Sequence, residues 1–522
     1  MKERDIYGRE TVAVWTAAEA AALDREARER HGVPERVLME DAGRSAALVL
    51  DRLYPRGRVV AAVGSGHNGG DALVMLRTLR AWGRDVACVA VGSRAPDPAL
   101  AHGHPIPILP FEEMAAAFAG AEVLVDGILG TGTSGAPRGR AAEAIRALHA
   151  SGRPVVALDL PSGVDATTGH VPGDVVSAAV TITFGWPKLG LLLEPGRSAC
   201  GRIIAVEIGF PPFGADAVDG PVPPARLLTP AWAAARLPRR GPAAHKGSVG
   251  RVLVAGGGHG MAGAAVTAAR AALRAGAGYV RLAAPEINRA VFQTRVPEAV
   301  YADADDAAAV RAAAGAVDAI VLGPGLGRGD DARRRLDLVI DASHGRPTLL
   351  DADALTLLAE APDRLRELAR ERPLLLTPHP GEMRALSGRA VDDIVAAPVD
   401  AARALAGTLG CAVLLKGAPS IVAAPGEPAW IATQHSSDLA TAGMGDQLAG
   451  AAAAFLAAGA PPAEAAGLAL FYCGRAAVLA GRGRSLVPDD VTEHLDRAFA
   501  DPGPAEPPLG LPFITFDQPP RW

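Results

Sequence analysis

Residues 441–450 read Thr-Ala-Gly-Met-Gly-Asp-Gln-Leu-Ala-Gly and lead into a run of small apolar residues over 449–460. The apolar run predicts a buried helix. Gly443 and Gly445 stand just before an acidic residue in what would be the first turn, and they let the backbone turn sharply there. A helix N-terminus offers free N–H groups and a partial positive charge, so this loop is suited to hold phosphate oxygens.

The carboxylate of Asp446 would stand beside such a phosphate. A negative side chain repels a phosphate unless it has a chemical task, and taking the proton from a hydroxyl that attacks phosphorus is such a task. An acidic residue in the first turn also stabilises the helix dipole without any catalytic role. The stretch by itself leaves both interpretations open.

The composition indicates a large globular protein of two or more domains. The chain has 522 residues, of which 49% are hydrophobic and 21% charged, and its net charge of −5 is spread without a basic block. We therefore expect no nucleic-acid partner, and no apolar run has the composition of a membrane span. Scattered cysteines favour reduced core residues in a cytoplasmic protein over a zinc site: Cys88, Cys200, Cys411 and Cys473.

The first half opens with a predicted helix and a phosphate-binding layout. Thr16 and Glu19 form a capping box that predicts a helix over 16–29. The apolar strand 58–63 runs into the Gly-rich segment 64–71, and a helix is expected to follow. This order is typical of phosphate-binding turns, although the glycines would also suit an ordinary tight turn.

Two later apolar strands, 121–126 and 154–158, also end in polar and Gly-rich residues. The carboxyl ends of parallel strands meet at one edge of the sheet, where ligands bind. We therefore expect four side chains to converge at that edge: Asn68, Asp126, Asp159 and Ser162. Lys188 is either a partner for an anionic ligand or a solvated loop lysine.

The Pro-rich segment 211–242 predicts a domain junction around residue 225. Beyond it, strand–turn–helix patterns restart, which predicts a second, larger α/β unit with its own row of strand-end polar groups. Within that row, His379 is flanked by prolines at a strand end, which favours a site residue over a core or capping histidine. Residues 501–522 are expected to be a loose Pro-rich tail.

The ordered motifs of both halves resemble a known family. Those of the first half are similar to the NAD(P)H-hydrate epimerase family, the YjeF N-terminal domain, at 38–43, 67–71, 126–132 and 159–165. Those of the second half are similar to ADP-dependent NAD(P)H-hydrate dehydratases of the ribokinase-like superfamily, at 245–250, 256–265, 323–327, 351–355, 377–382, 416–417 and 442–446. The whole chain therefore resembles the bifunctional NAD(P)H-hydrate repair enzymes.

The resemblance implies two three-layer α/β domains and a repair function. A Rossmann-like epimerase domain would span 1–222, a ribokinase-like dehydratase domain 223–500, and the tail 501–522. NADH and NADPH hydrate at C6 of the nicotinamide ring, and the first domain would interconvert the R and S hydrates. The second would dehydrate the S form with ADP, giving NAD(P)H, AMP and phosphate. The family also implies K⁺, Mg²⁺ and a homo-oligomer.

The resemblance assigns roles to individual residues. Asp159 would be the acid/base group of the epimerase, and Asp446 the base of the dehydratase. The first domain would contact the hydrate NADHX or NADPHX through Asp159 and two loops: His67, Asn68, Gly69, Gly70, Asp71, Gly130, Thr131, Gly132, Thr133, Ser134, Gly135 and Ala136. Potassium would bind Asn68, Asp126 and Ser162, whose oxygen atoms suit a hard cation. In the second domain the hydrate would contact Ala265, Gly325, His379 and Asp446, and ADP would contact Lys416, Gly417, Ala418, Pro419, Ser420 and Gly445.

The sequence departs from the family pattern at some of these positions. His67 replaces the first of two asparagines, and Gln447 follows the catalytic acid where an apolar residue is usual. These changes bear on rate and substrate contact more than on reaction class. The alternative function is a ribokinase-like kinase of a small alcohol, fused to a non-catalytic dinucleotide-sensing domain.

Overall fold

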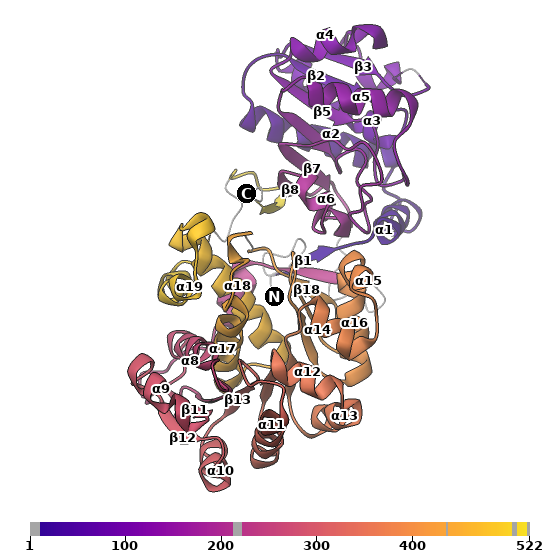
Figure 1. The fold of residues 1–522 in the computed structure, drawn as a ribbon. Helices are drawn as coiled ribbons and strands as arrows, with labels where there is room; N and C mark the ends of the chain where they lie inside the picture. Colours follow the sequence, from indigo (N-terminus) through magenta and orange to yellow (C-terminus); the bar gives the residue numbers. More distant parts are fainter. Residues whose placement is uncertain (1–10, 95, 212–221, 435–436, 504–508, 519–522) are drawn as a thin grey trace. The chain divides into compact units, whose positions relative to one another are not determined.

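The computed structural model describes residues 11–94, 96–211, 222–434, 437–503 and 509–518. The chain forms two compact units (Figure 1). The first contains the described residues up to Ala225 together with 509–518, and the second contains Arg226–Gly503. The division falls close to the junction expected around residue 225, and both units are α/β structures of the expected class.

The first unit is built on one sheet with the strand order β19-β8-β7-β6-β5-β2-β3-β4. Every pair of neighbours in it is parallel except β19 and β8. The strands are β2 (Val59–Val63), β3 (Val86–Ala90), β4 (Ile108–Leu109), β5 (Val123–Gly127), β6 (Val155–Leu158), β7 (Val180–Phe184), β8 (Arg202–Val206) and β19 (Ile514–Gln518). The order changes direction beside β2, and such a switch point opens a crevice at the carboxyl ends of the strands.

Helices cover both faces of this sheet because alternate residues of each strand point to opposite sides. Val59, Ala61 and Val63 of β2 pack in one cluster with residues of α2 and α3, while Val60 and Ala62 pack with α4 and α5. The elements of this unit outside the sheet are β1 (Thr11–Val14), α1 (Ala17–Glu29), α2 (Glu35–Leu53), α3 (His67–Ala81), α4 (Met114–Ala119), α5 (Gly139–Ala150) and α6 (Gly196–Ala199).

The expectation of a loose tail is wrong for residues 514–518. These residues form β19, which pairs antiparallel with β8 at the edge of the first unit's sheet. Asp517 accepts two hydrogen bonds from the guanidinium of Arg202, at 2.7 and 2.6 Å. The partners lie 315 residues apart in the sequence, so no local pattern announces the pairing.

The second unit has the strand order β9-β18-β17-β16-β15-β14-β13-β10-β11-β12. The strands from β16 to β12 in this order are parallel, and β17 and β18 join them antiparallel. Their bounds are β9 (Ala225–Leu228), β10 (Arg251–Ala255), β11 (Tyr279–Ala284), β12 (Val300–Asp303), β13 (Ala319–Leu322), β14 (Thr348–Leu350), β15 (Leu374–Leu376), β16 (Ala412–Leu415), β17 (Ile421–Ala423) and β18 (Ala429–Ile431).

The helices of the second unit lie against this sheet (Figure 1). They are α7 (Pro230–Arg236), α8 (Ala262–Arg274), α9 (Arg289–Arg295), α10 (Ala307–Gly315), α11 (Asp330–Ala342), α12 (Asp353–Ala359), α13 (Pro362–Glu371), α14 (Pro380–Ser387), α15 (Val391–Ala396), α16 (Pro398–Leu409), α17 (Met444–Ala457), α18 (Pro462–Ala480), α19 (Pro488–Glu493) and α20 (Leu495–Ala500).

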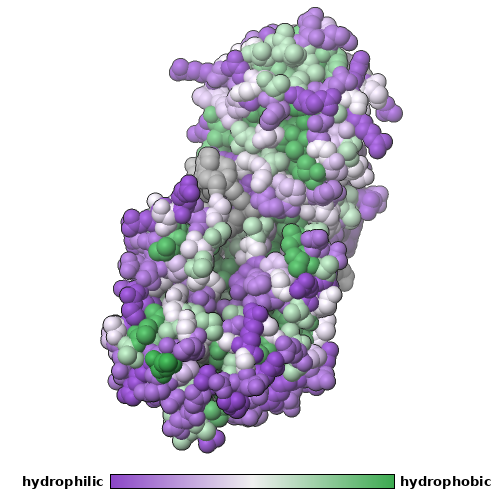
Figure 2. Space-filling view, in the orientation of Figure 1, coloured by the Kyte–Doolittle hydropathy of each residue, from purple (hydrophilic) through white to green (hydrophobic). Residues whose placement is uncertain are grey.

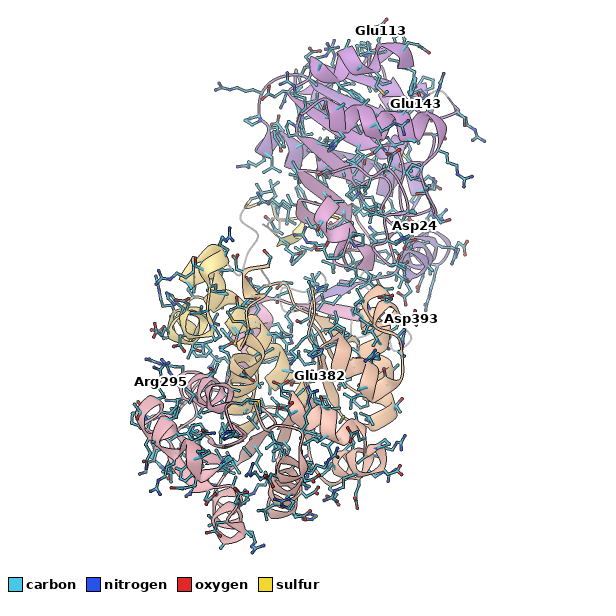
Figure 3. All side chains as sticks on the ribbon, viewed as in Figure 1. Asp24, Glu113, Glu143, Arg295, Glu382 and Asp393 are labelled. Carbon is cyan, nitrogen blue, oxygen red and sulfur yellow. The ribbon has the colours of Figure 1, made fainter. Side chains whose placement is uncertain are left out.

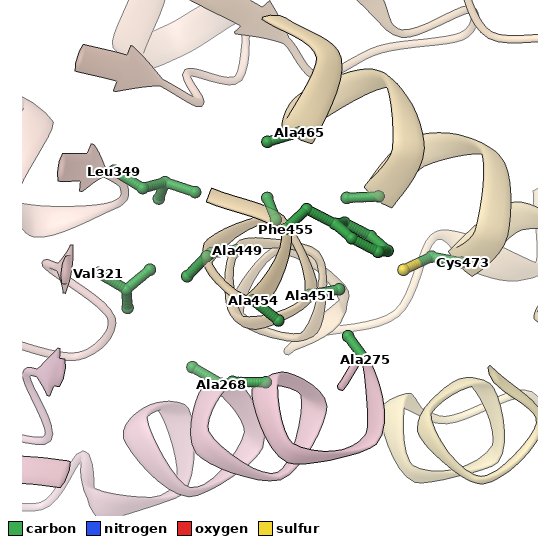
Figure 4. Packing of buried hydrophobic residues seen from close by; sticks show 14 of the residues in the cluster. Ala268, Ala275, Val321, Leu349, Ala449, Ala451, Ala454, Phe455, Ala465 and Cys473 are labelled. Carbon is green, nitrogen blue, oxygen red and sulfur yellow. The ribbon is translucent and has the colours of Figure 1, made fainter. Parts of the chain in front are cut away.

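Helix α17 is the centre of this unit's core, as its small apolar residues predict. Figure 4 shows it in end view, with Ala268 of α8 on one side, Ala465 of α18 on another and Val321 of β13 on a third. Gly450 permits the close approach of α8, because a Cβ atom there would lie 2.0 Å from the carbonyl oxygen of Ala268. This packing fixes where the first turn of α17 begins.

Helix α18 is long and apolar enough to cross a membrane by composition, but 67% of it is buried inside the unit. That burial is the pattern of a core helix. On the face shown in Figure 2, hydrophobic residues of this unit form small separate patches among hydrophilic ones. All four cysteines are buried, as expected.

Candidate active sites in the two units

A cavity of about 350 Å³ opens in the first unit at the carboxyl end of its sheet. Helix α1 contributes Asp24, which Figure 3 labels, and α3 contributes His67 and Asp71. Trp186 stacks on Phe210 with ring centroids 5.1 Å apart and forms an aromatic wall. The remaining lining includes Trp15, Leu38, Met39, Thr131, Gly132, Asp159, Phe184 and Lys188.

Three of the four side chains expected to converge do so beneath this edge. Asp126 accepts hydrogen bonds from the Ser162 amide at 2.8 Å and the Ser162 hydroxyl at 2.7 Å. Asn68 donates to the carbonyl of Leu129 at 2.7 Å, and the Leu129 amide donates to the Ser162 hydroxyl at 2.9 Å. Burial raises the pKa of Asp126 to about 6 although these hydrogen bonds oppose the shift.

The oxygen atoms of this cluster fit a cation. Asn68 Oδ1 is buried and accepts no hydrogen bond from the described residues. Burying this oxygen without a donor beside the fully buried carboxylate of Asp126 costs free energy, unless a positive charge binds to both. A potassium ion held by Asn68, Asp126 and Ser162 would satisfy both, since alkali ions take oxygen ligands.

Asp159, the fourth side chain, lies in the cavity and pairs with Lys188. The Lys188 ammonium donates to Asp159 Oδ1 at 2.6 Å, to Thr183 Oγ1 at 3.2 Å and to the Phe184 carbonyl at 2.8 Å. Lys188 is 5% exposed, so the solvated-lysine alternative is wrong. Asp159 has a φ of +63°, an arrangement uncommon outside glycine that turns its side chain sharply off the strand end.

The two loops assigned to substrate differ in their placement. Asp71 is buried and lines the cavity, whereas His67 is 78% exposed at its mouth, with Nε2 2.9 Å from Glu35. From the second loop, Thr131 and Gly132 line this cavity. Thr133, Ser134 and Gly135 instead line a neighbouring hollow of about 100 Å³ with Asp165 and Thr168.

The second site lies at the carboxyl ends of β14, β15 and β16. Asp351 follows β14 and is 1% exposed. It accepts hydrogen bonds from Thr377 Oγ1 at 2.8 Å and from Lys416 Nζ at 2.8 Å. Glu382 lies 4.0 Å from the same ammonium and sits in the interior of the second unit (Figure 3). Burial lowers the pKa of Lys416, but the charges of Asp351 and Glu382 outweigh it and raise the pKa overall.

Asp446 stands in the first turn of α17, directly after the loop that begins this helix. Gly443 caps the helix with a φ of +87°, a backbone conformation that glycine adopts more readily than other residues. A Cβ atom on Gly445 would lie 3.4 Å from Lys416 Nζ, so loop and lysine are neighbours. Burial, and then the charge of Asp351, raise the pKa of Asp446 to about 6, partly offset by Lys416. A carboxyl with this pKa is suited to accept a proton near neutral pH.

His379 caps helix α14. Its Nδ1 accepts hydrogen bonds from the amides of Gly381 at 3.0 Å and Glu382 at 3.3 Å, and the His379 amide donates to the Glu382 carboxylate at 2.9 Å. The capping alternative therefore describes its local role, while its imidazole remains 56% exposed. A role in substrate contact stays a prediction.

The other assigned residues of the second unit differ in accessibility. Gly325, with a φ of +59°, lies against the carbonyl of Met261. The side chain of Ala265 is fully buried in the core, so it presents no surface to a ligand. The segment Lys416, Gly417, Ala418, Pro419 and Ser420 joins β16 to β17, and the Ser420 hydroxyl bonds Gly417 at 3.1–3.2 Å.

Sequence reasoning missed several groups that complete the sites. Asp351, Thr377 and Glu382 lie in recognised motifs, but nothing local shows that they surround Lys416. Their position directly after strands was the available signal. Gln447 is buried beside its acidic neighbour, and its amide donates to Cys473 Sγ at 3.4 Å, so this departure faces the core.

Comparisons with known proteins match each of the two units to a family. Residues 35–190 match the family described as YjeF-related protein N-terminus, and residues 252–497 match the family described as NAD(P)H-hydrate dehydratase. Proteins named bifunctional NAD(P)H-hydrate repair enzyme from Thermofilum pendens and Moorella thermoacetica are 35% and 36% identical. Each alignment covers 90% of this chain and 92% of the relative.

Two further comparisons concern a mycobacterial relative and a solved structure. The protein of the same name from Mycobacterium tuberculosis is 38% identical, over 78% of this chain and 80% of that protein. A solved structure of an ADP/ATP-dependent NAD(P)H-hydrate dehydratase from Bacillus subtilis, co-crystallised with ATP and Mg²⁺, is 28% identical. It covers 52% of this chain and 96% of that chain, with a TM-score of 0.45.

Proposed function

Because the chain belongs to the bifunctional NAD(P)H-hydrate repair enzymes, we propose that its two units restore hydrated NADH and NADPH to the reduced dinucleotides. The first unit interconverts the R and S hydrates, and the second dehydrates the S hydrate with ADP. The observation that carries the proposal is a buried carboxylate–lysine pair at the strand ends of each unit, Asp159 with Lys188 and Asp351 with Lys416.

In the first unit, Asp159 exchanges a proton with the C6 hydroxyl of the hydrate. The C6–oxygen bond opens with help from the lone pair of the ring nitrogen, and water returns on the other face. Lys188 fixes Asp159 in place, because the ammonium donates to Asp159 and is itself held by Thr183 and the Phe184 carbonyl. The aromatic wall of Trp186 and Phe210 offers an apolar surface for a flat ring.

The potassium ion implied by the family fits the cluster of Asn68, Asp126 and Ser162. Bound there, it would supply positive charge at the strand edge and order the loops that carry these residues. The chain's own contribution is a set of oxygen ligands preorganised by the bonds between Ser162 and Asp126. The buried Asn68 Oδ1 without a donor supports this placement.

In the second unit, Asp446 takes the proton of the hydrate hydroxyl, whose oxygen attacks the β-phosphoryl group of ADP. AMP leaves, and phosphate is then expelled from C6 as the ring nitrogen's lone pair forms the N1=C6 bond. Loss of a proton from C5 returns the pair to nitrogen and leaves the C5=C6 double bond of NAD(P)H. The amides of Gly443 and Gly445 at the start of α17 would stabilise the transferring group. Mg²⁺ would accompany the nucleotide and neutralise phosphate charge.

A recovery assay tests both activities at once. A mixture of R and S hydrates is incubated with ADP, Mg²⁺ and K⁺, and the absorbance of reduced nicotinamide is followed. Full recovery supports both activities, recovery of the S fraction alone contradicts the epimerase, and no recovery with a stable phosphorylated alcohol would support the kinase alternative. We further propose that the protein acts on both NADHX and NADPHX and forms a homo-oligomer, which a measurement of native mass tests. We also propose that it acts in the cytoplasm, which cell fractionation tests.

A further inference from the structure

The epimerase cavity contains a second buried carboxyl that the reaction as described above leaves unused. Asp71 is the fifth residue of α3, is 9% exposed and lines the same cavity as Asp159. Its carboxyl accepts no hydrogen bond from any residue that the structure describes. Burying a carboxyl without a hydrogen-bond donor costs free energy, so its presence indicates a function. Because the carboxyl opens onto the cavity, we expect that function to be in the reaction there.

The two carboxyls differ in their charge partners. Lys188 is committed to Asp159 at 2.6 Å, and its other two donors are bound to Thr183 and Phe184. Asp71 has no hydrogen bond to this ammonium, and the charge of Lys188 only partly offsets that of Asp159 at its carboxyl. Burial, and then the charge of Asp159, raise the pKa of Asp71 well above its usual value. The cavity therefore holds two carboxyls in different settings, Asp159 bonded to a lysine and Asp71 without a hydrogen-bond donor among the described residues.

Epimerisation at C6 needs such an arrangement. A proton must reach the departing hydroxyl on one face of the ring, and another must leave the water that attacks the opposite face. A single group would have to serve both faces, whereas two groups in opposite protonation states serve one each.

We propose that Asp71 is the second catalytic residue of the epimerase, acting as the acid while Asp159 acts as the base. This inference rests on the proposed epimerase function of the first unit. Asp71 gives its proton to the C6 hydroxyl, the C6–oxygen bond breaks with its electron pair on the leaving water, and the nitrogen lone pair forms the N1=C6 bond. Water then adds to the other face of C6, the π pair returns to nitrogen, and Asp159 takes the proton.

After one turnover the proton has moved from Asp71 to Asp159 and the total charge is unchanged. Before a second turnover in the same direction, Asp159 releases its proton to water in the cavity and Asp71 takes one up from water, so no reactant other than water is needed. This division of roles explains why Asp159 is paired with a lysine and Asp71 has no such partner among the described residues. The two carboxyls must differ in their affinity for a proton.

The test uses the full chain with Asp71→Asn, which keeps the shape of the side chain and removes its proton. We expect the rate of epimerisation to fall at least about 100-fold in both directions. In the recovery assay this variant should restore the S fraction at the wild-type rate and leave the R fraction. Asp51→Asn, which removes an acid of the same unit outside the cavity, is the matched control and should restore both fractions.

Folding and binding are measured beside activity. Asp71→Asn should unfold at or above the wild-type temperature, because it removes a carboxyl whose pKa is raised on folding, and it should be stabilised by the hydrate to the wild-type extent, which a loss of structure would not allow. Epimerisation within threefold of wild type in Asp71→Asn overturns the inference. If the wild-type chain itself restores the S fraction alone, the proposed epimerase function fails instead, so the two failures are distinguishable.

Discussion

Lys188 Nζ lies 2.6 Å from Asp159 Oδ1, and the two side chains are 7% and 13% exposed. Taking both charges out of water is offset by their attraction and by the additional hydrogen bonds of the ammonium. Removal of either partner leaves the other charge buried and uncompensated. The pair therefore couples the stability of the first unit to the chemistry of its cavity.

The first prediction concerns this pair. Lys188→Met should destabilise the first unit by about 3–5 kcal/mol, because Asp159 loses its cation in a buried place. Epimerisation should fall with it. The double variant Lys188→Met with Asp159→Asn should regain stability but not activity, as measured by urea unfolding and by the recovery assay. A double variant as unstable as the single one would contradict the coupling.

The second prediction is a pH dependence of dehydration. Asp446 works as a carboxylate, and its pKa is about 6, so log kcat/KM should be level above that pH and fall with unit slope below it. Asp446→Asn should abolish dehydration. A profile with no decline between pH 7 and pH 5 would be incompatible with this residue as the base.

Ionisation of Asp446, which dehydration requires, should lower the stability of the folded protein. The folded-state pKa of Asp446 lies above the unfolded value of 3.8, so its ionisation opposes folding above pH 6, and this cost disappears below pH 3.8. Asp446→Asn should therefore raise the unfolding temperature at pH 8, with the gain vanishing toward pH 4. Scanning calorimetry at both pH values measures the difference.

A third prediction addresses potassium. Removing K⁺ should lower the rate of epimerisation and leave dehydration by the second unit unchanged. Asp126→Asn keeps the shape of the cluster but removes its charge, so the response to K⁺ should be lost. Potassium affinity of the wild type should weaken below pH about 6 as Asp126 takes up a proton. An unaltered K⁺ titration in the variant would place the ion elsewhere.

The fourth prediction concerns the packing of α17 on α8. Gly450→Ala places a methyl group 2.0 Å from the carbonyl oxygen of Ala268, so the helices must separate. We expect a loss of about 1–3 kcal/mol in the free energy of unfolding. Gly263→Ala is the control, because a Cβ atom on this exposed glycine of α8 meets nothing within 4 Å. The control should be neutral or stabilising.

The last prediction tests β19. Asp517→Ala removes two hydrogen bonds from the Arg202 guanidinium, and the first unit should lose about 1.5–3 kcal/mol of stability. A chain that ends at Gly503 should lose more, because the edge of β8 is then exposed. Unfolding of the second unit should be unaffected. Wild-type stability of the shortened chain would mean that β19 does not contribute.

The amino-acid sequence by itself determined the features that depend on neighbours along the chain. The capping box at Thr16 and Glu19 is confirmed, with the Thr16 side chain accepting from the Glu19 amide. The helix over 444–457 follows from its run of small apolar residues. The order of strands and Gly-rich turns also predicted that polar groups would gather at the strand ends, because parallel strands share one carboxyl edge.

The tertiary structure decided every feature that depends on charge and burial across distant segments. The sequence allowed Lys188 to be either a partner for an anionic ligand or a solvated lysine, and its burial against Asp159 excludes the solvated lysine. Asp71 looks like a loop residue in the sequence, yet it is a buried acid beside another acid. The tail was assigned from its prolines, but β19 finds its partner 315 residues away. Periodicity and turn chemistry are local, whereas the partners that set a carboxyl's charge or complete a sheet are chosen by the fold.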